Sequence, residues 1–134
     1  MWKQIVGVVV GLVAWIAVAV VAGFLLRWLW PEYVAASGDM AFTLPMKLTR
    51  LSIGALATVA AGAVAALLGR SSRAAMIVGV VLLVLFIPVH VNLWGKFPVW
   101  YHLTFLASLV PLAVAGGRIA RRGRGPAPRR GQGF

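Results

Sequence analysis

The chain lacks cysteine entirely, and only two of its 134 residues are acidic. The absence of cysteine excludes disulfides, thiolate metal sites and the small four-helix membrane enzymes that move electrons through cysteine pairs. No carboxylate pair, Ser–His–Asp set or phosphate-binding glycine loop is recognisable in the sequence. We therefore expect a protein that is not an enzyme, has no catalytic residues and needs no cofactor.

Charged residues are also scarce, at 11% of the chain, whereas 62% of the residues are hydrophobic. A soluble domain usually has about 25% charged residues. A domain of this size cannot bury so large an apolar excess, because small domains leave much of their surface exposed. Lipid is the natural solvent for that surface, so the composition predicts an integral membrane protein.

Four apolar tracts approach the roughly 20 residues that cross a bilayer core. Their sequences lack the alternating pattern of barrel strands, so helices are expected. A cleaved secretory signal is a weaker interpretation of the first tract, because its apolar run continues past Ala19 to Leu26. The predicted fold class is all-α, an integral membrane bundle of four transmembrane helices. The expected spans are residues 5–26, 49–69, 74–94 and 98–117, and the helix of the second span is expected to start near Pro45, because proline suits a first helical turn.

The distribution of Lys and Arg predicts that both termini are cytoplasmic. This orientation puts nine basic residues inside (Lys3, Arg70, Arg73 and the six arginines of the tail) and four outside (Arg27, Lys47, Arg50 and Lys96). Six aromatic residues, Trp28, Trp30, Tyr33, Trp94, Trp100 and Tyr101, then fall at outer helix ends, as expected for a membrane-interface belt. The expected location is the bacterial cytoplasmic, or inner, membrane.

Residues 118–134 are rich in Gly, Pro and Arg and are expected to form a disordered basic tail. We expect this tail to contact anionic lipid rather than nucleic acid, although docking on RNA or on a cytosolic partner is an alternative. The arginines concerned are Arg118, Arg121, Arg122, Arg124, Arg129 and Arg130.

Small residues recur at four-residue spacing in the first two predicted helices. In lipid, such residues allow helix backbones to approach closely. The second predicted helix is small on much of its surface and is the candidate centre of the bundle. Its partner could be a helix of the same chain or another copy. The predicted packing positions are Gly7 and Gly11, followed by Gly54, Gly62 and Ala66.

All histidines and acids of the chain fall at the predicted outer face. The expected polar cluster consists of His90, Asn92, His102, Glu32 and Asp39. Three interpretations are open: interfacial polar groups, a proton or ion site, and a metal site built from the two histidines and one acid. The first is favoured because polar groups at headgroup depth are inexpensive, so no metal ligand is assigned. Pro88 predicts a kink nearby in the third helix.

Several short elements resemble those of small, uncharacterised bacterial inner-membrane proteins with four helices. The elements are Leu44–Pro45, Gly69–Arg70, Asn92 with the turn sequence FPVWYH, and Gly116–Gly117 before Arg118. The resemblance implies the four-helix layout, and no activity comes with it.

These observations predict a small multi-pass membrane protein that acts through helix–helix association. It would work as a homo-oligomer or as an accessory subunit of a membrane protein partner, in contact with the lipid bilayer. The alternatives are a transporter or channel subunit whose pathway forms by oligomerisation and, less well supported, a small basic-tailed protein of the phage lysis type.

Overall fold

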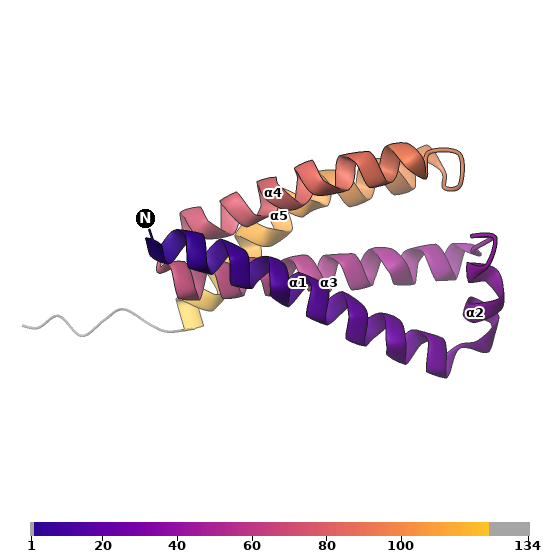
Figure 1. The fold of residues 1–134 in the computed structure, drawn as a ribbon, viewed down its shortest axis with the longest axis horizontal. Helices are drawn as coiled ribbons and strands as arrows, with labels where there is room; N and C mark the ends of the chain where they lie inside the picture. The colour runs from indigo at the N-terminus through magenta and orange to yellow at the C-terminus, as the bar shows by residue number, and fades with distance from the viewer. Residues whose placement is uncertain (1, 124–134) are drawn as a thin grey trace, which may run out of the picture.

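The computed structural model describes residues 2–123, and within this range the regular structure is entirely helical, with no strands (Figure 1). Four of its helices are long and apolar enough to cross a membrane, as the sequence predicts. A fifth, short helix joins the first two. In chain order the helices are α1 (Trp2–Leu29), α2 (Pro31–Ser37), α3 (Leu44–Gly69), α4 (Ser72–Asn92) and α5 (Val99–Gly123).

Two helix ends differ from the expected spans by more than three residues. Helix α3 begins at Leu44, before the expected span but next to Pro45, where the sequence predicts the start of the helix; extended Thr43 precedes it and the proline lies in its first turn. Helix α5 continues past Gly117 to Gly123. Arg118, Arg121 and Arg122 therefore lie on a helix and not in a disordered tail. The rest of the expected tail, with Arg124, Arg129 and Arg130, lies outside the described residues.

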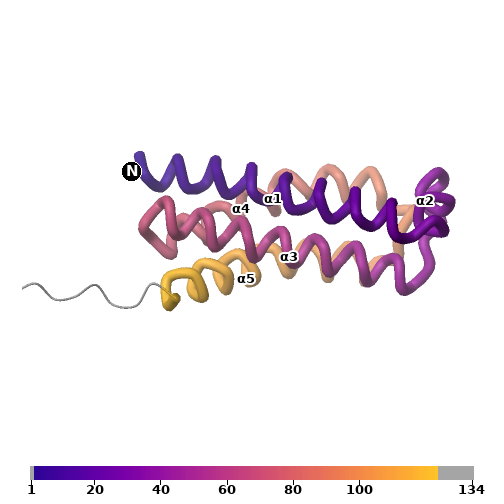
Figure 2. The backbone as a smooth tube through the Cα atoms, turned by 90° about the horizontal axis from the view of Figure 1, so that it is seen from below, coloured from indigo at the N-terminus to yellow at the C-terminus, as the bar shows by residue number. Residues whose placement is uncertain are grey.

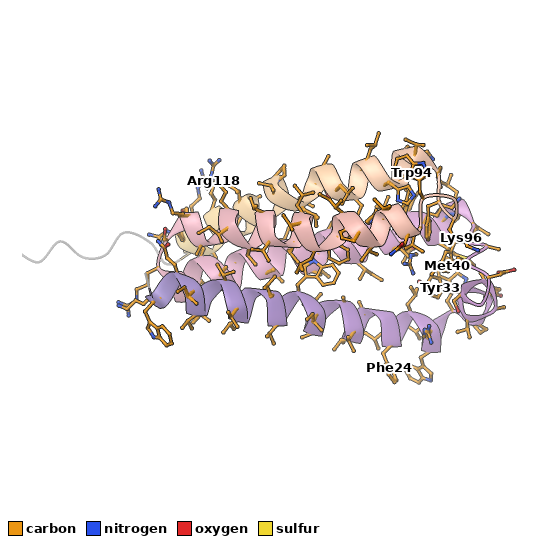
Figure 3. The ribbon with its side chains drawn as sticks, turned by 45° about the horizontal axis from the view of Figure 1, so that its top comes forward. Phe24, Tyr33, Met40, Trp94, Lys96 and Arg118 are labelled. Atoms are coloured by element: carbon orange, nitrogen blue, oxygen red, sulfur yellow. The ribbon has the colours of Figure 1, made fainter. Side chains whose placement is uncertain are left out.

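The bundle has two distinct ends (Figures 1 and 2). One end carries α2 and the turn between α4 and α5, and we call it the α2 end. The other end carries the start of α1, the turn between α3 and α4, and the end of α5. Figure 3 shows Lys96 and Trp94 at the α2 end and Arg118 at the opposite end. Phe24, on α1, is 75% exposed and points away from the bundle, as expected for a lipid-facing side chain.

Helix α3 packs against all three other long helices, and small residues make these contacts close. A Cβ atom added at Gly7 would lie 2.5 Å from the Ala65 carbonyl oxygen of α3, and one at Gly11 would lie 2.8 Å from that of Ala61. On another face of α3, Gly62 meets the carbonyl oxygen of Ala113 on α5 in the same way. The small residues of α1 and α3 are therefore occupied by packing within one chain.

Helices α1 and α3 diverge toward the α2 end (Figure 1). Trp15 lies where the divergence begins: its indole N–H donates to the Thr58 hydroxyl over 3.1 Å, and its ring lies 4.8 Å from that of Phe86. Farther along α1, a Cβ atom added at Gly23 would have no neighbour within 4 Å. A large side chain thus separates the helices beyond the region where glycines hold them together.

Helix α4 stays one helix through Pro88 and ends at Asn92. His90 is buried, whereas Asn92 is exposed. This difference follows from their separation of about 200° around a regular helix. Only one of the two can face the other helices, and the structure places His90 there.

Candidate functional site

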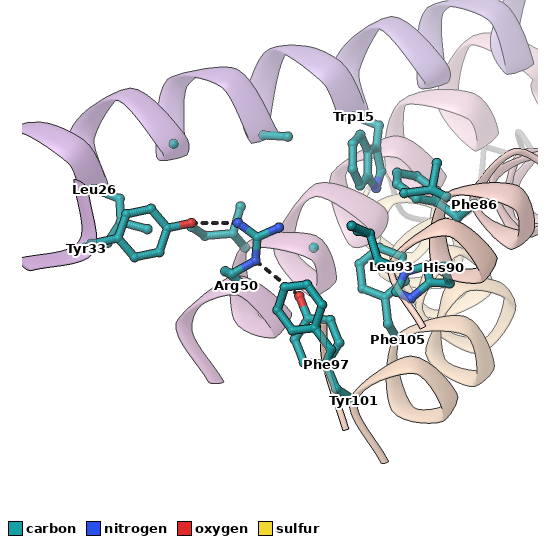
Figure 4. A pocket seen from close by; sticks show the side chains of 15 residues that line it. Trp15, Leu26, Tyr33, Arg50, Phe86, His90, Leu93, Phe97, Tyr101 and Phe105 are labelled. Atoms are coloured by element: carbon teal, nitrogen blue, oxygen red, sulfur yellow. Dashed lines mark hydrogen bonds between the residues drawn. The ribbon is translucent and has the colours of Figure 1, made fainter. Parts of the chain in front are cut away.

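A cavity of about 240 Å³ lies between the helices at the α2 end (Figure 4). Helix α1 contributes one stripe of side chains at helical spacing, from Trp15 through Ala19 and Gly23 to Leu26. The other four helices and the turn before α5 supply the rest of the lining. Ala19 and Gly23, at the centre of this stripe, are small, and α1 and α3 have already diverged there. These two residues therefore leave the space of the cavity open.

Three aromatic rings close the cavity on the side away from α2. The Trp15 and Phe86 ring centroids are 4.8 Å apart, and those of Phe86 and Phe105 are 5.1 Å apart. Phe105 packs against Gly54, where an added Cβ would lie 2.7 Å from its ring. This aromatic floor separates the cavity from the tightly packed half of the bundle.

Arg50 carries the permanent charge of the cavity lining. It lies in the second turn of α3, and its Nη1 donates to the Tyr33 hydroxyl over 2.7 Å. Its Nε donates to the Tyr101 hydroxyl over 3.3 Å. Figure 4 shows the guanidinium held between the two phenols. Because Tyr33 lies on α2 and Tyr101 on α5, one arginine connects three helices.

Aromatic faces complete the surroundings of this guanidinium. Its Cζ lies 4.8 Å from the centroid of the Phe42 ring and 5.6 Å from that of Phe97, within cation–π range. Four rings follow one another here: the centroids of Tyr33 and Phe42 are 5.1 Å apart, those of Phe42 and Phe97 5.9 Å, and those of Phe97 and Tyr101 4.4 Å. Stacking and hydrogen bonds together give Arg50 a defined position.

The two histidines form a buried pair beside the cavity. The Nδ1 atoms of His90 and His102 are 2.7 Å apart, and the His102 Nε2 is 3.4 Å from the Trp94 carbonyl oxygen. A carbonyl can only accept, so His102 Nε2 is the donor and, in the neutral ring, its Nδ1 is the acceptor. His90 therefore donates through Nδ1, and its Nε2 remains an acceptor at the cavity, which His90 lines.

The structure brings together two of the five residues of the expected polar cluster. Glu32, Asp39 and Asn92 are exposed, and the Asp39 carboxylate accepts from the Ala41 backbone N–H over 3.3 Å. Within residues 2–123, no group of three His, Cys, Asp or Glu side chains could hold a metal ion. In this part of the chain the metal interpretation thus lacks its third ligand, whereas the two histidines are in contact.

Sequence reasoning missed the central residue of the site, because it counted Arg50 as one more charge on the outer face. A signal was present. Arg50 lies one turn before Gly54 and continues the four-residue spacing of Gly54, Thr58 and Gly62. Once Pro45 is taken as the first turn of the helix, Arg50 must share the inward face of α3.

Comparisons with known proteins found no matching family model, no matching curated protein and no matching solved structure. The resemblance to small four-helix inner-membrane proteins accordingly remains an expectation from short sequence elements. Function has to be inferred from the cavity and from the groups around it.

Proposed function

We propose that this chain is a non-enzymatic integral protein of the bacterial cytoplasmic membrane that binds an amphiphilic molecule at its α2 end. The observation that carries the proposal is the cavity of about 240 Å³, which is lined by residues from all five helices. Small-molecule sites are typically concave and apolar, with a few well-placed polar groups. Apolar walls with Arg50 and His90 match that description.

The size of the cavity limits what it can hold. Sites for drug-sized ligands are usually about 300–1,000 Å³, so 240 Å³ is small for a complete lipid. The cavity suits a headgroup and the first part of an apolar chain, with the remainder in the bilayer. Gly23 lines the cavity, and a Cβ atom added there would have no neighbour within 4 Å, so the remainder of the chain would leave the cavity beside Gly23.

The distribution of charge supports an orientation with the α2 end outside and both termini in the cytoplasm. The end opposite α2 carries a larger set of basic residues, of which those on α5 would attract anionic lipid by about 1 kcal/mol each. In the described range these residues are Lys3, Arg70, Arg73, Arg118, Arg121 and Arg122. The α2 end carries Arg27, Lys47, Arg50 and Lys96, together with both acids, Glu32 and Asp39.

Action through oligomerisation has less support from the geometry. The small-residue faces that would join copies are used between α1, α3 and α5 of one chain. A transport path through a single chain would have to cross the floor made by Trp15, Phe86 and Phe105. A partner protein or a second copy would therefore bind through lipid-facing side chains, with the cavity providing the specific chemistry.

A cavity-filling variant tests the binding function. Gly23→Leu would place its Cβ atom where no neighbour lies within 4 Å, and because Gly23 lines the cavity, the leucine side chain should fill it. Ala17→Leu adds a similar bulk on the exposed face of the same helix and is the matched control. Native mass spectrometry of protein extracted from its membrane should show a bound amphiphile in the wild type and in Ala17→Leu, but not in Gly23→Leu. Equal occupancy in all three would refute the proposal.

The absence of cysteine makes the orientation easy to test. Single cysteines at Lys96, in the turn at the α2 end, and at Ser72, at the opposite end, would both be exposed. We expect a membrane-impermeant thiol reagent to label Lys96→Cys in intact cells and Ser72→Cys only after permeabilisation. The reverse pattern would contradict the proposed orientation.

A further inference from the structure

We propose that the bound amphiphile has an anionic headgroup, a carboxylate or a phosphate ester, and that Arg50 is the residue that binds it. The inference rests on the proposed binding function and adds the chemical class of the ligand. Four observations about the Arg50 site carry it: the remaining donors of the guanidinium, the neutrality of its partners, its depth in the bundle and the apolar walls beside it.

The guanidinium has hydrogen-bonding capacity beyond its protein contacts. Arginine has five N–H donors in a planar fork, and the two tyrosine hydroxyls accept one each. Arg50 also lines the cavity, so its remaining donors are within reach of an occupant. A planar fork of this kind matches the paired oxygens of a carboxylate or phosphate.

The groups around Arg50 orient its charge and do not neutralise it. Tyr33 and Tyr101 are phenols, and Phe42 and Phe97 contribute only ring faces. The cavity lining, which is drawn from residues 2–123, includes no acidic side chain. Glu32 and Asp39 are on the same end of the bundle but are exposed. A half-buried charge without a counter-charge attracts an anion strongly in these low-dielectric surroundings.

The depth of Arg50 fits a lipid-type headgroup. Helix α3 has 26 residues, or about 39 Å at 1.5 Å per residue, which exceeds the hydrocarbon thickness of about 30 Å. Arg50 is six residues from the start at Leu44, or about 9 Å along the axis. This position falls near the boundary between hydrocarbon and headgroups, where a carboxylate or phosphate of an amphiphile lies.

The apolar part of the cavity argues against a free inorganic ion as the occupant. Beyond Arg50 the lining consists mainly of hydrocarbon and aromatic groups, with Leu26 and Gly23 on α1 and Val89 and Leu93 on and after α4. A small hydrated anion would leave these apolar walls without van der Waals contacts. A ligand with an anionic head and an apolar chain contacts both kinds of surface.

The test compares ligands that share a chain or share a charge. Dodecyl phosphate, dodecanol and inorganic phosphate would be titrated into the full-length protein in neutral-detergent micelles and followed by calorimetry. Lys47→Gln is the matched control for Arg50→Gln, because it removes the same charge one turn earlier on α3 and lies outside the cavity. Arg50→Lys retains the charge, and Gly23→Leu fills the cavity.

Wild type and Lys47→Gln should bind dodecyl phosphate at least about tenfold more tightly than dodecanol, equivalent to about 1.4 kcal/mol. Arg50→Gln should lose this preference, and helicity equal to that of the wild type in circular dichroism would show that the variant is folded. Arg50→Lys should retain part of the preference. Inorganic phosphate should bind far more weakly than dodecyl phosphate.

Three results would overturn the inference, and they separate it from the proposed function. Equal affinity of the wild type for dodecyl phosphate and dodecanol would refute an anionic headgroup but leave amphiphile binding intact. Loss of the preference in Lys47→Gln as well would show a general effect of charge and not a site at Arg50. Inorganic phosphate binding as tightly as dodecyl phosphate would identify a free anion as the ligand and refute amphiphile binding too.

Discussion

The contact between α3 and α5 at Gly62 leads to a sharp prediction about stability. Replacing Gly62 with Ala would drive the new methyl group into the backbone carbonyl of Ala113, which cannot move without its helix. Overpacking of this kind typically costs about 1–3 kcal/mol. The better helix propensity of alanine returns up to about 1 kcal/mol. Because the overlap at Gly62 is with backbone, we take the upper end of the cost and expect Gly62→Ala to lower the free energy of unfolding by about 2 kcal/mol.

Gly23→Ala provides the matched control, because the same chemical change occurs there with no atom within 4 Å. It should leave stability unchanged or raise it by up to about 1 kcal/mol, through helix propensity alone. Both variants can be compared by titrating purified protein in mixed micelles with a denaturing detergent and following helicity. If Gly62→Ala proved as stable as Gly23→Ala, the close crossing of α3 and α5 would be wrong.

Two further predictions concern buried polar contacts. Thr58→Val removes the acceptor of the Trp15 indole N–H and should destabilise the protein by about 0.6–2 kcal/mol. Thr58→Ser should retain the hydrogen bond. The detergent titration would measure both variants, and equal losses of stability would contradict the role of the hydroxyl. His102→Ala removes a fully buried ring that contacts His90, so it should lower the free energy of unfolding by about 2–4 kcal/mol. The control Asn92→Ala, at an exposed position, should lower it by at most about 0.5 kcal/mol. Similar effects of the His102 and Asn92 variants would contradict the separation of these residues in the structure.

The four long helices could be predicted from the sequence because length and hydropathy determine which segments can cross lipid. Helix ends were less accessible to this reasoning, since they depend on capping and on backbone conformation. The end of α3 at Gly69 was predicted correctly; there Arg70 adopts a left-handed conformation with φ of 52°, and its N–H bonds back to the Ala66 carbonyl. The end of α5 past Gly117 was missed, because hydropathy does not show how far a helix continues beyond its apolar tract.

The site was predictable only where its residues are close in sequence. His90 and His102 flank one turn, so hairpin geometry alone places them at similar depth, and the structure adds that their rings are in contact. Arg50 and Tyr101 are 51 positions apart in the chain, and their contact depends on how α3 packs against α5. The expected grouping of Glu32 and Asp39 with the histidines was based on a shared end of the bundle. Location at one end does not determine which side chains turn inward.

The same placement of small and large residues explains both the fold and the cavity. Gly7 and Gly11 hold α1 against α3 over one half of the bundle, and Trp15 separates the two helices from there on. The space between the diverging helices would be expected to close, because the side chains around an empty apolar space lose van der Waals contacts. Arg50 opposes the collapse by fixing α2 and α5 to α3 through two tyrosines. In lipid, a hydrocarbon side chain could act as a spacer at lower cost than a charge, which is the physical reason for proposing that Arg50 binds an anionic ligand.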